Sequence, residues 1–199
     1  MVRRFAVALS CGLIAVSGWS AVAQDQTPPG ASQEQMEAMM KAWQAFATPG
    51  EEHKKMAEMV GEWTGTMQDF SYGEPQTSEA SAKFTLLMDG RYLMQEISGN
   101  MGGMEFKGMG LTGYNNQTKT FQEIWIDSMG TAIFYSEGKR LDEKTVESKG
   151  KMTMPGMGDV ETRTLAKRID KDTHEFNIHT PGPDGKEKLA VKITYTRKK

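Results

Sequence analysis

The stretch GRYLMQEISGN-MGGMEFKGMGLTGY-NNQTKTFQEIWIDSMGT, residues 90–131, decides the fold. It contains three extended segments in a row, in which apolar and polar side chains alternate, joined by turns rich in glycine and asparagine. The same rhythm continues to the C-terminus, where Leu189, Val191, Ile193 and Tyr195 share one face of the last segment. Helical periodicity does not return after Val60, so the chain is predicted to be mainly β from there on.

Ten strands are predicted after the N-terminal region: Trp63–Asp69, Ser78–Met88, Arg91–Ser98, Met104–Tyr114, Thr120–Ile126, Thr131–Gly138, Thr145–Met154, Val160–Ile169, His174–Thr180 and Glu187–Arg197. Short strands that follow one another through short turns favour a closed antiparallel up-and-down barrel.

The predicted turns are of two kinds, which alternate along the chain and therefore gather at opposite ends of the barrel. One kind is short and polar: 88–90, 115–117, 141–144 and 170–172. The other is longer and rich in glycine and proline: 71–76, 99–103, 127–130, 155–158 and 181–186. Methionines gather at the second kind, so we expect one tightly connected end and one methionine-lined mouth.

The N-terminal 23 residues have the features of a secretory signal peptide. Arg3 and Arg4 precede a short apolar run, and Ala21-Val22-Ala23 is an A-x-A cleavage site. Cleavage after Ala23 would take the formal net charge from −2 to −4 and remove Cys11, the only cysteine. We expect a periplasmic or secreted protein without disulfides and without an integral membrane segment.

Two helices are predicted between the signal peptide and the barrel. Residues 24–47 comprise a proline-containing linker and a helix that begins at the capping box Ser32-Gln33-Glu34-Gln35; its apolar stripe is Met36, Met39, Met40 and Trp43. We expect the stripe to pack on the barrel, with partner binding as the alternative. A short capping helix, Glu51–Val60, follows the start signal Thr48-Pro49-Gly50-Glu51 and opens the barrel domain, residues 48–199.

Several functional classes lack support in the sequence. The balanced charge, with no basic run except Arg197-Lys198-Lys199, argues against nucleic-acid binding. No nucleophile elbow, phosphate loop, dinucleotide-binding fingerprint or His-Glu-x-x-His motif is present, which argues against the common hydrolases. No cofactor is predicted, and the oligomeric state stays open.

The segment Gly61-Glu62-Trp63 before the first strand resembles the start of calycin barrels, which include the lipocalins. That resemblance implies that Trp63 packs at the closed end, under Arg197 from the last strand. The runs 49–53, 61–65, 90–93, 106–108, 113–115 and 125–131 resemble the bacterial family called domain of unknown function 1579, over about residues 49–195. Relatives often carry Asp at the position of Asn115, so we expect no charge-dependent role there. The family implies no activity.

Two carboxylates stand out because they share a strand face with aromatic residues. Glu123 and Asp127 alternate with Phe121 and Trp125, whereas Ile124 and Ile126 occupy the other face. If the first face points inward, each carboxylate needs a partner, which Arg91 or Arg163 could supply. Such a pair would be either a structural ion pair or a device that orients a ligand, and the sequence leaves open which face is inward.

Histidine and methionine offer weaker possibilities. His174 and His179 are an odd number of residues apart on one strand and face opposite sides, so they cannot form a two-histidine metal site. Barrels of the nitrobindin type bind haem through one histidine, a role for which His174 is the candidate. The spacings Met101-x-x-Met104 and Met152-x-Met154-x-x-Met157 are compatible with Cu(I), but an adaptable apolar rim is the favoured interpretation.

The leading functional hypothesis is that a small, largely apolar ligand binds in the barrel. The candidate ligand-binding residues are Tyr92, Phe106, Tyr114, Trp125, Asp127 and Tyr135, with Met101, Met104, Met129 and Met157 at the rim. One alternative is a filled barrel that serves as a protein-interaction or envelope module. The other is an unusual enzyme, which requires Asp127, Glu123 and His53 to converge.

Overall fold

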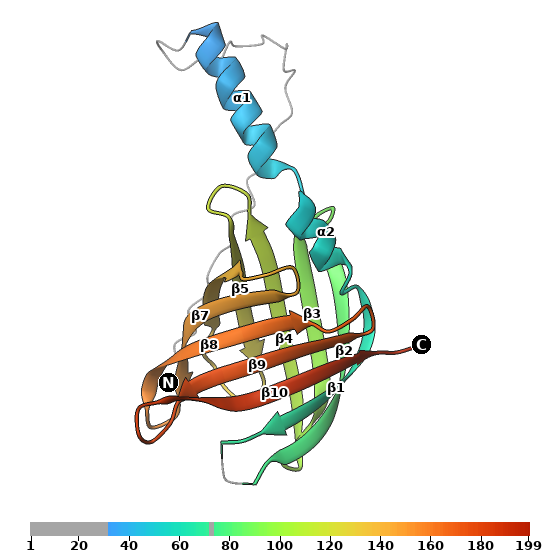
Figure 1. The fold of residues 1–199 in the computed structure, drawn as a ribbon, viewed down its shortest axis with the longest axis vertical. Helices are drawn as coiled ribbons and strands as arrows, with labels where there is room; N and C mark the ends of the chain where they lie inside the picture. The colour runs from blue at the N-terminus through green and yellow to red at the C-terminus, as the bar shows by residue number, and fades with distance from the viewer. Residues whose placement is uncertain (1–31, 72–73) are drawn as a thin grey trace, which may run out of the picture. The chain divides into compact units, whose positions relative to one another are not determined.

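The computed structural model describes residues 32–71 and 74–199, and most of them form a closed antiparallel barrel (Figure 1). Each strand pairs with its sequence neighbours, and β10 closes the barrel onto β1 through the register Trp63↔Arg197 to Asp69↔Val191. The strands are β1 (Gly61–Asp69), β2 (Gln76–Leu87), β3 (Tyr92–Met101), β4 (Met104–Asn115), β5 (Thr120–Asp127), β6 (Phe134–Arg140), β7 (Thr145–Met154), β8 (Gly158–Arg168), β9 (Thr173–Pro181) and β10 (Glu187–Arg197).

The predicted mainly β barrel of ten strands is confirmed. Most strand bounds lie within two residues of the prediction, and β6 differs most, because it begins at Phe134 rather than Thr131. The connection between β5 and β6 is therefore longer than the predicted turn. The predicted signal peptide and most of the linker lie outside the described residues.

Helix α1 (Gln33–Ala47) begins at the predicted capping box. The Gln35 amide donates to Ser32 Oγ over 3.2 Å, and the Ser32 amide donates to Gln35 Oε1 over 2.8 Å. The boundary between two compact units of the chain falls inside this helix, between Met39 and Met40. In the unit that contains the barrel, Met40 is 68% exposed and Trp43 is 62% exposed. The expectation that these two side chains pack on the barrel is therefore wrong.

Helix α2 (Glu51–Ala57) begins at the predicted residue and ends three residues before the predicted Val60. Gly50 is the N-cap, and its amide donates to Nδ1 of His53 over 3.0 Å, so the imidazole performs the capping role. The same ring contacts Tyr114 of β4 edge to face, with 5.8 Å between ring centroids. His53 thus fixes the helix to the barrel.

Helix α2 lies at the end of the barrel that carries the short polar turns, which we call the closed end (Figure 1). Arg140, the last residue of β6, binds Oε2 of Glu52 through Nε and Nη2, over 2.7 and 2.5 Å. In the turn between β4 and β5, the Asn116 amide donates to the carbonyl oxygens of Ala45, Phe46 and Thr48. These bonds attach the residues before β1 to two separate turns of the closed end.

The core of the closed end is built on Trp63, which is fully buried. Its indole N–H donates to the carbonyl oxygen of Met59 over 2.8 Å, and the Arg197 guanidinium lies 4.1 Å from the ring centroid. Arg197 also donates to the carbonyl oxygens of Glu58 and Val60, so it ties β10 to the segment after α2. The remaining members of this core are Met56, Ala82, Phe84, Leu93, Ile97, Phe121 and Tyr195.

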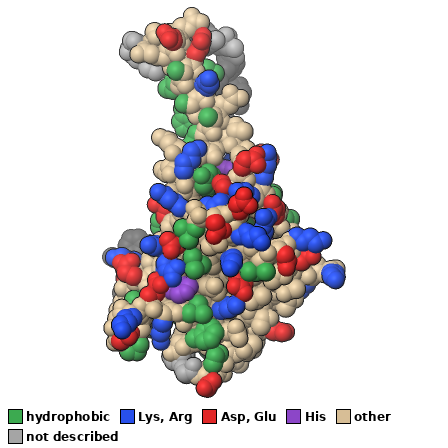
Figure 2. Space-filling view, viewed as in Figure 1, with side chains coloured by type: hydrophobic (Ala, Val, Ile, Leu, Met, Phe, Trp, Pro, Cys, Tyr) green, Lys and Arg blue, Asp and Glu red, His purple; other side chains and the backbone are tan. Residues whose placement is uncertain are grey.

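The other end, which we call the open end, carries the turns rich in glycine and proline; they vary from two residues between β3 and β4 to six between β5 and β6, whereas each turn of the closed end has four. Between β3 and β4 the chain turns at Gly102 and Gly103, whose φ angles of 59° and 87° favour glycine. Met104, Met129 and Met157 lie at this end and are exposed. The outer face that Figure 2 shows mixes lysine and arginine with aspartate and glutamate and presents no field of a single sign.

Candidate functional site

The interior of the barrel changes character along its axis. At the closed end the largest buried inward side chains are Trp63, Phe84, Phe121 and Tyr195, and Tyr114, Val146 and Phe176 pack against them half-buried. Farther along the same inward rows the side chains are only half-buried, and we call this part the open half; its largest inward side chains are Met67, Phe106, Trp125, Phe134, Met152, Val160, Ile178 and Val191. Side chains inside a closed barrel can remain accessible only where the interior is not filled. The interior of the open half is therefore less tightly filled than the core around Trp63.

Trp125 lies across the inner surface of the open half. A Cβ atom on Gly108 would come within 2.3 Å of its indole ring, and one on Gly110 within 3.2 Å, so the ring lies against the bare backbone of β4. Phe106 stacks beside it, with ring centroids 6.5 Å apart and an interplanar angle of 22°. Two glycines thus give Trp125 the room to lie flat along the wall, where one ring face looks into the interior.

Glu123 precedes Trp125 by two residues and points to the same side, next to Thr112 on β4 and Ser136 on β6. Ser136 donates its hydroxyl to Oε2 of Glu123 over 3.1 Å, and the Ser148 hydroxyl also bonds to this carboxyl group. Both serines are almost completely buried, whereas Glu123 keeps some accessible surface. Glu123 therefore lies on the inner wall of the barrel, with its carboxyl group bonded to two buried hydroxyls.

The surroundings of Glu123 disfavour its negative charge. Burial raises the pKa of the Glu123 carboxyl above its ordinary value, and the hydrogen bonds from Ser136 and Ser148 oppose that shift only in part. The predicted partners are elsewhere: Arg91 binds the carbonyl oxygen of Met88, and Arg163 pairs with Glu187 on the outer surface. The expectation that either arginine neutralises Glu123 is wrong, because both belong to outward or turn positions.

Asp127 ends β5 and is engaged at both oxygens. The Trp125 indole donates to its Oδ2 over 2.7 Å, and the Met129 amide donates to its Oδ1 over 2.9 Å. Asp127 thus holds the indole in place and shapes the turn that follows. Its side chain is half-buried at the open end and is the second carboxyl group on the inward face of β5.

The structure brings together some of the predicted ligand-binding residues. Phe106, Trp125 and Asp127 belong to the open half, and Tyr114 faces inward at the closed end, where it contacts Phe121. Tyr92 and Tyr135 lie on the outer face, since their strand neighbours Leu93 and Ser136 are inward, and both are exposed. Met101, Met104, Met129 and Met157 lie at the turns of the open end.

Sequence reasoning missed the polar groups that surround Glu123. The inner faces of β6, β7 and β8 carry buried hydroxyl groups: Ser136, Ser148, Thr162 and Thr164. Gln95 donates to the Tyr195 hydroxyl over 2.8 Å across 100 residues of sequence, and burial raises the pKa of Tyr195 to about 12. The alternation of serine and threonine on β6 to β8 was a visible signal, but isolated hydroxyl residues occur on most strands.

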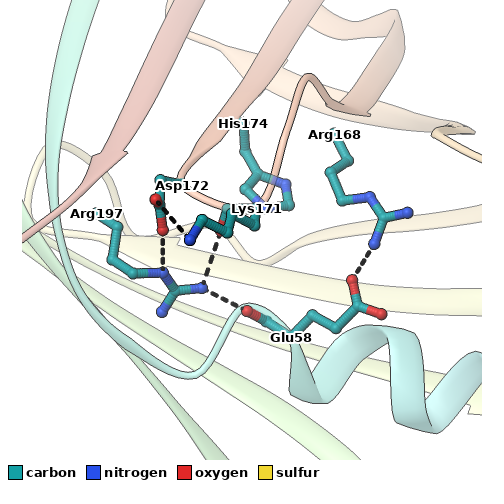
Figure 3. Close-up of a pocket in the computed structure, with 6 residues that line it drawn as sticks. All are labelled: Glu58, Arg168, Lys171, Asp172, His174 and Arg197. Carbon is teal, nitrogen blue, oxygen red and sulfur yellow. Dashed lines mark hydrogen bonds and ion pairs between the residues drawn. The ribbon is translucent and has the colours of Figure 1, made fainter.

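The closed end holds a separate charged pocket of about 350 Å³, which Figure 3 shows. Arg168 pairs with Glu58, and Arg197 lies 3.4 Å from Oδ1 of Asp172. His174 stands among these charges, its ring edge to face with Trp63 at 5.1 Å. Burial, helped by Arg168 and Arg197, lowers the pKa of His174 to about 4. This histidine therefore lies at the closed end, away from the open half.

The three residues of the enzyme hypothesis do not converge. His53 contacts Tyr114, which pairs with Phe121 near the start of β5, whereas Asp127 is the last residue of that strand. Six residues of extended chain separate Phe121 from Asp127, or about 20 Å. Within residues 32–71 and 74–199, no three His, Cys, Asp or Glu side chains are close enough to hold a metal ion. Among the helices described, none is long and apolar enough to cross a membrane.

Two solved structures have a fold similar to that of this chain. The structure is similar to Rv2717c from M. tuberculosis, with a TM-score of 0.57, 11% identity, and coverage of 76% of this chain and 100% of that one. It is also similar to an S-type phycobiliprotein lyase, CPES, from Guillardia theta, with a TM-score of 0.52, 12% identity, and coverage of 75% and 94%. A search among curated proteins gave no match. Residues 48–197, the barrel with its capping helix, match one family model, and the chain belongs to that family, "Protein of unknown function (DUF1579)".

Proposed function

We propose that this protein binds a small, largely apolar ligand in the open half of its barrel. The observation that carries the proposal is the contrast between the large aromatic side chains: Trp63, Phe84 and Phe121 are buried at the closed end, whereas Trp125, Phe106 and Phe134 are half-buried. A pocket lined by apolar and aromatic side chains with few polar groups is the usual form of a small-molecule site. The ligand enters between the turns of the open end, where methionines form an adaptable rim.

The proposal includes the place where binding occurs. The predicted signal peptide would direct the chain out of the cytoplasm, and removal of residues 1–23 would leave the barrel intact. The similar barrel of a phycobiliprotein lyase supports the proposal at the level of the fold only.

A binding titration with a matched pair of variants tests the proposal. The probe is N-phenyl-1-naphthylamine, which is uncharged at neutral pH and brightens in apolar surroundings. Trp125→Ala is compared with Ile124→Ala, its neighbour on the exposed outer face of β5. We expect saturable binding that weakens at least about tenfold, or about 1.4 kcal/mol, in Trp125→Ala alone.

Two results would overturn the proposal. One is the absence of saturable binding to the wild-type protein, together with no bound cargo in native mass spectra of protein purified from its own host. The other is full probe affinity in a Trp125→Ala variant whose circular dichroism and thermal melt show a folded barrel.

A second candidate function is partner binding through helix α1. Trp43 and Phe46 contact each other edge to face, with ring centroids 5.8 Å apart, and Met40, Trp43 and Phe46 are all exposed. Exposed aromatic side chains of this kind are common at protein interfaces. Deletion of residues 24–47 should abolish a specific partner complex and leave probe binding in the barrel unchanged.

A further inference from the structure

The interior of the barrel contains a carboxyl group, that of Glu123, to which residues 32–71 and 74–199 supply no cation. The arginines among the described residues each pair with a carboxylate other than Glu123; these arginines are Arg91, Arg140, Arg163, Arg168 and Arg197. The lysine salt bridges in the same residues also leave out Glu123. Carboxylates inside proteins are normally paired with a cation or kept neutral.

The open half is acidic and aromatic. Following the strand register around the barrel from Trp125, its positions are mostly apolar, small or hydroxylated, with the amide of Gln95 on β3; the lysine on an inward row is the exposed Lys188, which pairs with Thr180 near the start of β10. The carboxylates on its inward rows are Glu123 and Asp127 on β5 and Asp69 at the end of β1. Trp125, Phe106 and Phe134 present aromatic rings to the same space, and aromatic faces attract cations.

We propose that the ligand of the open half is a small amphipathic amine whose ammonium group pairs with Glu123 and whose apolar part lies against Trp125 and Phe106. This inference rests on the proposed binding function and specifies the chemistry of the ligand.

The hydrogen bonds of Glu123 leave room for such a group. An ionised carboxylate has about four acceptor positions. The hydroxyls of Ser136 and Ser148 occupy part of them from the barrel wall, and the side chain lies on the inward face of β5. An ammonium N–H donates to the remaining positions and supplies the positive charge that the wall lacks. Asp127 is about 13 Å farther along β5, so it attracts the amine toward the site without competing for the same contact.

The test uses two probes that differ only in the charged group, 4-phenylbutylamine and 4-phenylbutan-1-ol. Binding is followed by isothermal titration calorimetry and by tryptophan fluorescence, since the proposed site adjoins Trp125. Glu123→Gln preserves the shape and hydrogen-bonding capacity of the side chain but cannot become negative. Glu96→Gln makes the same substitution at an exposed position of β3 and serves as the matched control.

We expect the wild-type protein to bind the amine at least tenfold more tightly than the alcohol. Glu123→Gln should remove this preference and leave the affinity for the alcohol unchanged, whereas Glu96→Gln should preserve both. The groups that face Glu123 are the hydroxyls of Thr112, Ser136 and Ser148, so its own titration should govern the pH dependence. Amine affinity should fall on acidification in the wild type and stay level in Glu123→Gln.

The outcomes separate this inference from the proposed function. Equal affinity of the wild-type protein for the two probes, or a preference that survives in Glu123→Gln, overturns the amine while apolar binding stands. Failure of both probes and of N-phenyl-1-naphthylamine overturns the binding function itself. If Glu123→Gln does not fold, the comparison of amine with alcohol on the wild-type protein still decides the question.

Discussion

Glu123→Gln should make the protein more stable at neutral pH, although it replaces one of the two buried carboxyl oxygens with an NH2 group. The folded protein holds the Glu123 proton more tightly than the unfolded chain, because burial raises its pKa above the reference value of 4.5. The wild type therefore has its full stability below pH 4.5. It loses stability as the pH rises from there to the folded-state pKa, and above that value the loss is constant. Gln resembles the protonated acid and has no such loss.

The magnitude follows from linkage with one proton. The slope of the unfolding free energy that Glu123 contributes cannot exceed about 1.4 kcal/mol per pH unit. The variant should equal the wild type near pH 4 and exceed it at pH 7 by about 1.4 kcal/mol for each unit by which the folded pKa exceeds its reference. Urea unfolding from pH 4 to 8 gives the free-energy difference, and carboxyl-carbon NMR of Glu123 gives the pKa independently.

The two measurements must agree within error. Subtracting the variant from the wild type cancels the contributions of other carboxylates, including Glu52 and Glu187, whose pKa values are lowered by their arginine partners Arg140 and Arg163 against the effect of burial. A variant that is less stable than the wild type at pH 7, with no change in the difference toward pH 4, would refute the reasoning. It would mean that Glu123 is ionised and paired in the folded protein.

Three further predictions test the two halves of the barrel and the N-terminus. Trp63→Phe should cost about 2 kcal/mol or more in urea unfolding, because it removes a buried hydrogen bond and leaves a cavity, whereas Trp125→Phe should cost about 1 kcal/mol or less; equal costs would contradict an open half. The His174 pKa should be about 4 by NMR, and since the unfolded value is 6.5, stability should decline as pH falls from 6.5 toward 4; a titration near 6.5 would count against the charged pocket. The intact mass of protein from its own host should correspond to cleavage after Ala23, and an uncleaved mass would exclude export by this signal.

The number of strands and the two kinds of turn were predictable because both depend on local chemistry. Alternation of side chains reports a strand without knowledge of its partner, and polar turns such as 88–90 act over a few residues. The start of β6 was harder to predict, because Thr131, Ala132 and Ile133 have strand-like composition but do not pair with a neighbouring strand. Whether they pair depends on the neighbouring strands.

The inward face of β5 could not be chosen from its own sequence, because both faces carry large apolar residues. The neighbouring strand β4 determines which face of β5 points inward. Gly108 and Gly110 leave space for Trp125, whereas a residue with a Cβ at Gly108 would collide with the ring. Recognising that fit requires the register of β4 against β5. The hydroxyl partners of Glu123 depend in the same way on the register of β5, β6 and β7.

Glu123 also bears on the choice between a filled barrel and a binding barrel. A barrel selected only for stability gains nothing from a carboxyl group that is buried without a cation and that weakens the fold at neutral pH. An apolar residue at this position would avoid that penalty. The penalty has a physical use if a ligand supplies the cation, because pairing returns the energy lost by burial and makes binding selective for charge. Addition of 4-phenylbutylamine should therefore stabilise the wild type at pH 7 more than it stabilises Glu123→Gln, and in a filled barrel it should stabilise neither.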